Sequence, residues 1–447
     1  MDIELTNILL ENSKTTITRM RAHFAGLLIF AMILLTVLDI VNPGLFSLAA
    51  GACAWLAGAL IATNISNFQR VQVALMLVIG ASCIVGAETL GDPAWGRQLL
   101  IGNHAMLAML AAVTFLRLVT RTPRDSEENP RGPYALWQTL LAVHLFGAII
   151  NFSAALIIGH RISARQGRLT ALQAQVISRG FVAAATWSPL FASMAVVLAY
   201  IPGVNFLKLI SFNIFLAAAL ILYTGLRLQK NDQAEHFEGF PVHRDALTVP
   251  VILSAVAICL TQLPAQIPVL PLLVLACLLT VLILAPFQGL RAFARRAREH
   301  VITELPKMNS EFALFLAAAV LATGITALAS VGVINVRVDP SSAADGIIIM
   351  ISVAALSLIG IHPVISVAVL AGLLVETLSD PDLIAIAVLA AWATTLCTAP
   401  LSGFTLTMQS RFGIASTEFF KWNAGYTVIG LAMGSIMLLI YALVIGR

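Results

Sequence analysis

The chain has 447 residues, of which 59% are hydrophobic and 11% are charged, with a formal net charge of +4 and a mean hydropathy of +0.94. This composition excludes a soluble protein and requires many membrane-spanning segments. The small positive charge comes from basic loops beside apolar segments, so it indicates cytoplasmic loops and no nucleic-acid partner. The five cysteines lie in apolar stretches without metal-ligand spacing, and we expect no metal centre or organic cofactor.

Apolar windows of spanning length follow one another along almost the whole chain. Polar loops separate them, and basic and acidic loops sort to different sides. The thirteen windows are 22–42, 43–63, 71–90, 98–118, 134–159, 172–202, 205–227, 246–262, 267–286, 310–333, 344–376, 382–410 and 421–446.

If every window crosses the membrane once, the basic loop at 161–168 falls opposite the other basic loops, against the positive-inside rule. Treating 134–159 and 344–376 as re-entrant hairpins removes the conflict, because basic loops then flank the first hairpin on the cytoplasmic side and acidic loops flank the second outside. The sequence therefore predicts an all-α polytopic membrane protein with about 11 transmembrane helices, two re-entrant hairpins and a cytoplasmic N-terminus.

Landmarks in the two halves recur at one spacing. An offset of 211 residues relates Asn151 to His362 and also Pro189 to Pro400. Since each half then has an odd number of crossings, the two copies are predicted to be inverted, which is typical of secondary transporters. The predicted divisions are an N-terminal segment with the first helix (1–42), a first inverted repeat (43–228), a cytoplasmic linker (229–245) and a second inverted repeat (246–447).

Each repeat has a proline among hydroxyl residues inside an apolar window, at 172–202 and at 382–410. Proline breaks a helix, and in lipid such a break survives only against protein or a cavity. Broken half-helices offer free N–H groups to an anion and free carbonyls to Na⁺; the alternative is a pair of packing kinks. The candidate binding residues at the breaks are Thr186, Ser188, Pro189, Thr398, Pro400 and Ser402.

The predicted hairpin tips carry Asn151 with Ser153 in the first half and His362 in the second. Asn151, Ser153 and Ser188 form a possible Na⁺ site; the alternative is hydrogen bonding between two ordinary spans. His362 is either a proton-coupling group and anion donor, or a structural histidine.

Other polar residues lie near the breaks. Asn213 and Asn423, matched by the repeat with a small slippage, are candidates for lining the site. Arg179 either counters an anion or, the preferred interpretation, extends to the cytoplasmic interface, and Lys208 is interpreted as an interface anchor. The cluster from Arg291 to Arg298 is typical of an amphipathic helix on anionic lipid, a solvated face and not a transport site.

Neither predicted tip nor break carries a carboxylate, which favours an anion or a neutral polar molecule over a cation as substrate. The sequence has no Walker A motif and no hydrolase motif, so neither ATP coupling nor an enzyme is expected.

The order of spans, hairpin, broken helix and helix, followed by an inverted copy, resembles the ion transporter superfamily, which includes the divalent anion/sodium symporters. The similarity is one of architecture over nearly the whole chain. Asn151-Phe-Ser153 keeps the asparagine and a hydroxyl of the symporters' Ser-Asn-Thr tips, while His362-Pro363 departs from them. The resemblance implies Na⁺ and substrate sites at the tips and breaks, a homodimer, and a transport domain that moves as an elevator.

We therefore expect an inner-membrane secondary transporter of a small anion, most simply an organic carboxylate, coupled to Na⁺ or H⁺. An integral-membrane flippase or enzyme acting on a lipid-linked substrate is the alternative, and a membrane subunit of a larger complex is a third possibility. A lipid-facing groove with basic residues at headgroup level would favour the flippase.

Overall fold

The computed structural model describes residues 2–62, 65–91, 95–120, 129–241, 248–260, 267–334, 340–374 and 378–446. Within these ranges the structure is helical, and the β pairing amounts to one isolated antiparallel bridge between Arg131 and Glu238. This confirms the predicted all-α polytopic membrane protein. Outside the described residues lie the end of the predicted linker, 242–245, and the ends of two predicted windows, 261–262 and 375–376.

Among the described residues, eight helices are long and apolar enough to cross a membrane. Seven of them coincide with predicted crossings, and the eighth, α6 (Pro133–Ile150), is the first arm of a predicted hairpin. At 1.5 Å per residue α6 is about 27 Å long, which is close to the thickness of the hydrocarbon core. The re-entrant geometry of the hairpins stays a prediction.

The chain forms two compact units, each built from two separate pieces. Unit 1 comprises Met1–Val119 and Val256–Val331, and unit 2 comprises Thr120–Ala255 and Gly332–Arg447. Each unit thus takes one piece from each half of the sequence. The helices of unit 1 are α1 (Asp2–Leu38), α2 (Ser47–Ile61), α3 (Asn67–Thr89), α4 (Gly96–Ile101), α5 (His104–Leu116), α12 (Val269–Leu284), α13 (Leu290–Glu299) and α14 (Asn309–Ser330), while α11 (Thr248–Leu260) crosses the boundary between the pieces.

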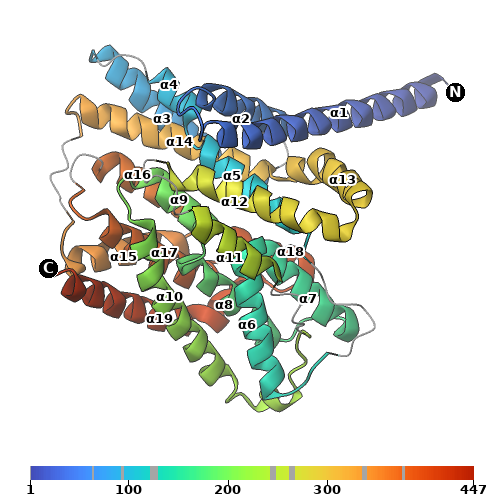
Figure 1. Ribbon diagram of the computed structural model, residues 1–447, viewed down its shortest axis with the longest axis vertical. Helices are drawn as coiled ribbons and strands as arrows, with labels where there is room; N and C mark the ends of the chain where they lie inside the picture. The colour runs from blue at the N-terminus through green and yellow to red at the C-terminus, as the bar shows by residue number, and fades with distance from the viewer. Residues whose placement is uncertain are drawn as a thin grey trace. The chain divides into compact units, whose positions relative to one another are not determined.

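In unit 1, α3 and α14 lie side by side and form its most extensive helix pair (Figure 1). Their backbones meet at Gly80 and Gly324. A Cβ atom on Gly80 would lie 2.5 Å from the Val320 carbonyl oxygen, and one on Gly324 would lie 2.3 Å from the Gly80 carbonyl oxygen. Small residues bring membrane helices this close when no aqueous hydrophobic force drives them together.

We expect Gly80→Ala and Gly324→Ala each to destabilise the protein by about 1–3 kcal/mol, because the added methyl meets backbone that no rotamer change can move. The measurement is the thermal unfolding midpoint in one detergent. Gly86→Ala on α3 is the matched control, since its Cβ would lie 3.5 Å from a Leu328 side-chain atom, an ordinary contact. Equal midpoints for the three variants would contradict this packing.

A wide helical turn at His300–Glu304 follows α13 and packs on α1. His300 is only 4% exposed, and its Nε2 lies 2.7 Å from the Thr114 hydroxyl. Its ring centroid is 4.6 Å from that of Phe115. Burial, followed by the nearby Arg117 charge, lowers the pKa of His300 to about 4.

This lowered pKa predicts a stability that depends on pH. Between about pH 6.5 and 4 the unfolded chain binds a proton at His300 that the folded chain does not, so folding stability is complete above pH 6.5 and falls as the pH drops. The loss approaches about 3 kcal/mol at pH 4. Unfolding midpoints of wild type and His300→Gln across this range measure it, and parallel pH profiles for the two proteins would refute the assignment.

Unit 2 contains one arrangement of helices twice. Two helices joined by a tight reversal come first, then two shorter helices separated by a non-helical break, then one long helix. α6 packs on α8 as α15 packs on α17, and α8 packs on α10 as α17 packs on α19. The helices are α6, α7 (Phe152–Gln166), α8 (Ala171–Ala183), α9 (Ala192–Tyr200) and α10 (Phe206–Leu228), then α15 (Ala343–Leu358), α16 (Pro363–Leu374), α17 (Pro381–Thr395), α18 (Gly403–Phe412) and α19 (Ser416–Val444).

The two halves of unit 2 also interlock. The return arm of each helix pair packs on the second piece of the other half's broken helix, so that α7 contacts α18 and α16 contacts α9. The tight reversals and the breaks of both halves therefore belong to one packed structure, although they lie about 200 residues apart in the sequence.

Candidate binding site at the two helix breaks

The first break lies between α8 and α9. A short 3₁₀ turn, Ala184–Thr186, ends the helix, and the chain stays non-helical through Pro189 to the start of α9. Thr186 and Ser188 are fully buried. The Thr186 hydroxyl donates to the Ala183 carbonyl at 2.9 Å, and the Ser188 hydroxyl donates to the Ala148 carbonyl at 2.5 Å. These side chains replace backbone hydrogen bonds that the break removes.

Asn151 forms the reversal between α6 and α7. It has a positive φ of 51°, a conformation that asparagine tolerates better than most residues. Its side-chain Nδ2 donates to the Leu190 carbonyl at 2.8 Å, while the Leu190 N–H donates to Ser188 Oγ at 3.2 Å. The structure thus brings Asn151 and Ser188 together around Leu190, with the half-buried Ser153 in the next turn.

At the second break, between α17 and α18, side-chain hydroxyls again donate to backbone carbonyls. The Ser402 hydroxyl donates to the Leu396 carbonyl at 2.7 Å, and the Thr405 hydroxyl donates to the Ala399 carbonyl at 2.8 Å. Thr398 is 1% exposed and its hydroxyl lies 2.7 Å from that of Thr427. Pro400 is half-buried between these groups.

His362 lies at the second reversal and caps a helix. Its Nδ1 accepts a hydrogen bond from the Val364 N–H at 3.2 Å, at the start of α16. Its ring packs edge-on against Trp392, with centroids 5.6 Å apart. An accepting Nδ1 carries no proton, so the ring is neutral in this arrangement.

The matched asparagines lie beside the breaks and are used differently. Thr186 Oγ1 lies 3.4 Å from the Asn213 carbonyl oxygen, and Thr398 Oγ1 lies 3.4 Å from the Asn423 carbonyl oxygen, which agrees with the repeat. Asn423 uses both ends of its amide: Nδ2 donates to the Cys397 carbonyl at 3.1 Å and Oδ1 accepts from Arg179. Asn213 Oδ1 is buried without a hydrogen-bond partner among the described residues.

Arg179 does not extend to the interface, contrary to the preferred interpretation of the sequence. It is 4% exposed, and its Nε donates to Asn423 Oδ1 at 2.8 Å. Its Nη2 donates to the Trp422 carbonyl at 2.7 Å and to Gln175 Oε1 at 2.9 Å. Three oxygens pointing at one guanidinium hold it inside the protein more firmly than snorkelling would hold it at the surface.

The hydrogen-bond partners of Arg179 in the described chain are neutral. Every hydrogen-bond partner is an amide or backbone oxygen, and its Cζ lies 5.3 Å from the ring centroid of Tyr426. Tyr426 is 1% exposed, and its hydroxyl has no hydrogen-bond partner among the described residues. Within the part of the chain that the structure describes, Arg179 is therefore a buried cation with neutral partners, and it lies beside a tyrosine hydroxyl that makes no hydrogen bond.

Helix N-termini differ between the two halves. α7 and α9, which meet through Asn151 and Leu190, start without a side-chain cap. In the second half, His362 caps α16 and Ser402 caps α18. Among the described residues, the first backbone N–H groups of α7 and α9 thus have no side-chain acceptor, unlike those of α16 and α18.

Sequence reasoning missed His144 on α6. It is 8% exposed, and its Nε2 accepts from Trp187 Nε1 at the first break at 3.2 Å. Its Nδ1 lies 3.2 Å from the Gly180 carbonyl oxygen, which requires a proton on that nitrogen. In the neutral form of His144, both ring nitrogens therefore make a hydrogen bond. The sequence signal was only a histidine seven residues before Asn151.

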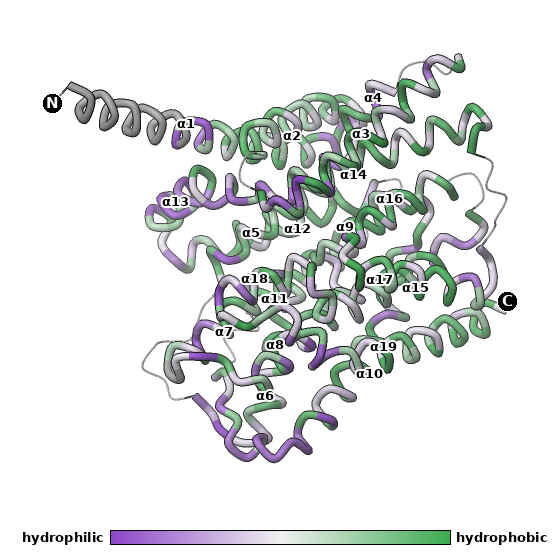
Figure 2. The backbone as a smooth tube through the Cα atoms, turned by 180° about the vertical axis from the view of Figure 1, so that it is seen from behind, coloured by the Kyte–Doolittle hydropathy of each residue, from purple (hydrophilic) through white to green (hydrophobic). Residues whose placement is uncertain are grey.

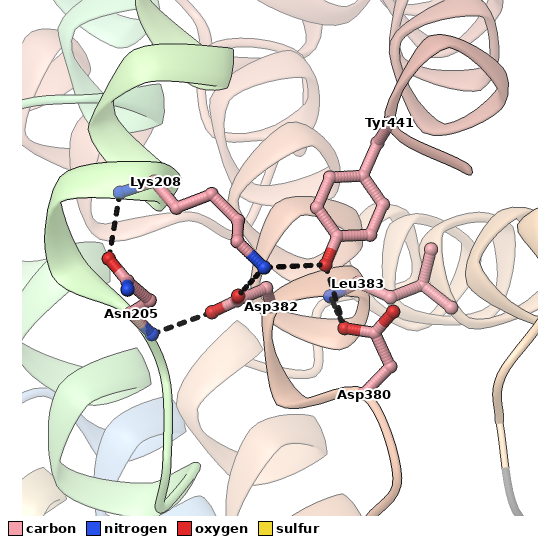
Figure 3. A network of polar contacts seen from close by, with 6 residues as sticks. All are labelled: Asn205, Lys208, Asp380, Asp382, Leu383 and Tyr441. Atoms are coloured by element: carbon pink, nitrogen blue, oxygen red, sulfur yellow. Dashed lines mark hydrogen bonds and ion pairs between the residues drawn. The ribbon is translucent and has the colours of Figure 1, made fainter. Parts of the chain in front are cut away.

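Lys208, interpreted from the sequence as an interface anchor, also has an ion partner that the sequence did not indicate. Its Nζ lies 2.7 Å from Asp382 Oδ2 (Figure 3). This ion pair joins the start of α10 to the start of α17. Asp382 Oδ1 accepts from the Asn205 N–H at 2.6 Å, and the Tyr441 hydroxyl donates to Asp380 Oδ1 at 2.8 Å. Two nearly buried carboxylates that looked like loop residues thus join three helices of unit 2.

Unit 2 also has a cavity of about 640 Å³ between the start of α15 and the end of α19. Its lining includes Ser341, Ser342 and Leu443, and none of the predicted site residues. The breaks themselves are closely packed, with Thr186, Ser188 and Thr398 at most 1% exposed.

Comparison with known proteins gives little further guidance. No model of a protein family matches the chain, and no curated protein matches it. Among solved structures, the chain is similar to the YdaH transporter of Alcanivorax borkumensis, with 15% sequence identity, a TM-score of 0.42 and coverage of 94% of this chain and 98% of that one. A similarity at this level establishes neither a common fold nor a common function. The class defined by composition and helices is a multi-pass membrane protein.

Proposed function

We propose that the protein is a secondary active transporter of a small anion, most simply an organic carboxylate. The observation that carries the proposal is Arg179, a nearly buried guanidinium whose described partners are all neutral. Burying an unpaired charge is costly, and an anion that pairs with it recovers part of that cost. The unused Tyr426 hydroxyl beside it supplies a further donor.

The helix breaks support the same substrate class. The uncapped N-termini of α7 and α9 offer backbone N–H groups and partial positive charge, which favour a carboxylate or another oxyanion. Interlocked broken helices in two similar halves are the usual frame of a transporter's binding site. We propose that the anion binds at the helix breaks of unit 2, beside Arg179.

A coupling ion fits the same region. Sodium prefers oxygen ligands, and Asn213 Oδ1, next to Thr186, is a buried oxygen that accepts no hydrogen bond from the described residues. Asn151 and Ser188 with the carbonyls around them are the second oxygen cluster. Coupling to H⁺ instead would involve His144 or His362, each of which has a ring nitrogen that accepts a hydrogen bond. The coupling ion is therefore either Na⁺ or H⁺.

The division into two units supports an alternating-access movement. Unit 2 contains the tight reversals, the breaks and Arg179, whereas unit 1 contains long helices such as α3 and α14. We propose that unit 2 carries the substrate and moves as an elevator in a homodimer. We propose that the N-terminus lies in the cytoplasm and that the protein is in the inner membrane of a bacterium.

A thermal-shift screen of the purified protein tests the function. Small anions are added in Na⁺ or K⁺ buffer at several pH values, because a bound ligand stabilises the folded state by mass action, about 2.7 kcal/mol at a concentration of 100 Kd. Stabilisation by one anion class only with Na⁺ identifies sodium coupling, and dependence on pH identifies proton coupling. Absence of stabilisation by any anion under every condition would overturn the proposal.

A further inference from the structure

The sequence of α13, Leu-Arg-Ala-Phe-Ala-Arg-Arg-Ala-Arg-Glu, separates into two faces. At 100° per residue, Leu290, Phe293, Ala294 and Ala297 share one side. Arg291, Arg295 and Arg298 occupy the adjoining side. This spacing makes a short helix that is apolar along one stripe and basic beside it, and Figure 2 shows how strongly α13 stands out from the apolar helices near it in the chain.

The chain reaches α13 directly from a spanning helix. α12 continues through a 3₁₀ turn to Gln288, within a stretch that is long and apolar enough to cross a membrane. Two large apolar side chains at this junction are left uncovered, Phe287 at 78% exposure and Leu290 at 66%. Their place at the end of a span puts them at the level where hydrocarbon meets headgroups.

One arginine holds α13 against unit 1 and leaves the others outside. Arg296 donates from Nη1 to the Leu118 carbonyl at 3.3 Å and from Nη2 to Gln288 Oε1. Arg291, Arg295 and Arg298 are exposed. The helix is thus fixed in place while its basic side faces away from the protein.

Further basic residues belong to the same end of unit 1. Arg117 follows the end of α5, next to the Leu118 carbonyl that holds Arg296. Two acidic residues lie nearby: Glu304 is paired with Lys307, and the exposed Glu299 ends α13. The excess of arginine at this end marks a cytoplasmic face under the positive-inside rule.

We propose that α13 is a binding site for anionic phospholipid headgroups of the cytoplasmic leaflet. Arg291, Arg295 and Arg298 contact the phosphates, while Leu290 and Phe287 insert into the interface beside α12. Charge complementarity selects an anionic headgroup, and the uncovered apolar residues select a lipid over a soluble anion. The site lies in unit 1 and is independent of Arg179 and of the transported substrate.

The test is native mass spectrometry of the full-length protein purified from membranes and exposed to phosphatidylglycerol or phosphatidylcholine. We expect the wild type to retain phosphatidylglycerol at least fivefold more than phosphatidylcholine. The triple variant Arg291→Gln, Arg295→Gln, Arg298→Gln should lose this preference, and the triple Arg→Lys variant should keep most of it. Raising the salt concentration to 0.5 M should weaken retention by the wild type, because exposed charges are screened.

Arg168→Gln with Arg411→Gln is the control, since both arginines are exposed and lie in unit 2. This double variant should retain phosphatidylglycerol like the wild type. Equal retention of the two lipids by the wild type, or unchanged preference in the triple glutamine variant, overturns the proposal. If the glutamine variant does not fold, the wild type and the lysine variant decide: loss of the preference in the folded lysine variant, or a preference insensitive to salt, overturns it too.

Discussion

Arg179→Gln should abolish anion-dependent stabilisation and transport. The variant removes the buried positive charge, and a charge-assisted contact with an anion is worth about 3 kcal/mol, or a loss of at least about 100-fold in affinity. Arg179→Lys keeps a charge but not the planar fork that reaches Asn423, Trp422 and Gln175, so we expect most of the affinity to be lost there too. Anion titrations followed by thermal shift, and uptake into liposomes, measure both effects.

Tyr426→Phe separates a binding role from a structural one. Because the Tyr426 hydroxyl is buried and has no hydrogen-bond partner in the described chain, its removal should leave the stability of the ligand-free protein unchanged or slightly raised. Anion affinity should nevertheless fall, by about tenfold for one lost hydrogen bond. The exposed Arg168→Gln should change neither quantity. For both predictions, an anion affinity equal to that of the wild type in the Arg179→Gln variant would show that the anion binds elsewhere in the protein.

Asp382→Asn should destabilise the protein by about 1–3 kcal/mol, because it removes one charge of a largely buried ion pair and leaves the other without a counter-charge. Asp382 is 5% exposed, and the pair with Lys208 joins α10 to α17 beside the Tyr441–Asp380 hydrogen bond (Figure 3). The expected loss of stability is smaller than for a fully buried ion pair, because the Lys208 side chain is 39% exposed and partly solvated. Thermal unfolding of the ligand-free variant measures it.

The chain offers a matched control for this ion pair. Lys421 on α19 pairs with Glu418 at 2.6 Å, with side chains 67% and 37% exposed. Glu418→Gln should cost less than about 0.5 kcal/mol, as for most surface pairs. Equal effects of the two substitutions would mean that the Asp382 pair does not hold the helices together.

Local signals gave much of the helical arrangement because they act over a few residues. Proline between hydroxyl residues marks the places where α8 and α17 end, and Asn151 occupies a reversal with a positive φ, which most non-glycine residues avoid. The hydroxyls of Ser188, Ser402 and Thr405 then satisfy carbonyls within unit 2, as a break in lipid requires.

The roles of charged and titratable residues were not readable in the same way. Arg179 near a helix end has the pattern of a snorkelling residue, and only its contacts with Asn423 and Trp422, more than 240 residues away, distinguish it. The same holds for Lys208 with Asp382, and for His144 with Trp187. Pairings at such separations depend on how the helices pack.

By itself, the sequence determined that this is a helical multi-pass membrane protein, because apolar windows and the need to satisfy every backbone group in lipid leave no other structure for such a composition. It also located the helix breaks, because proline disrupts the backbone hydrogen bonds of the helix in which it lies. Only the tertiary structure decided that Arg179 is buried beside Tyr426 and that Asn213 and Asn423 differ, since the environment of a charge is set by residues that the chain brings together from both halves.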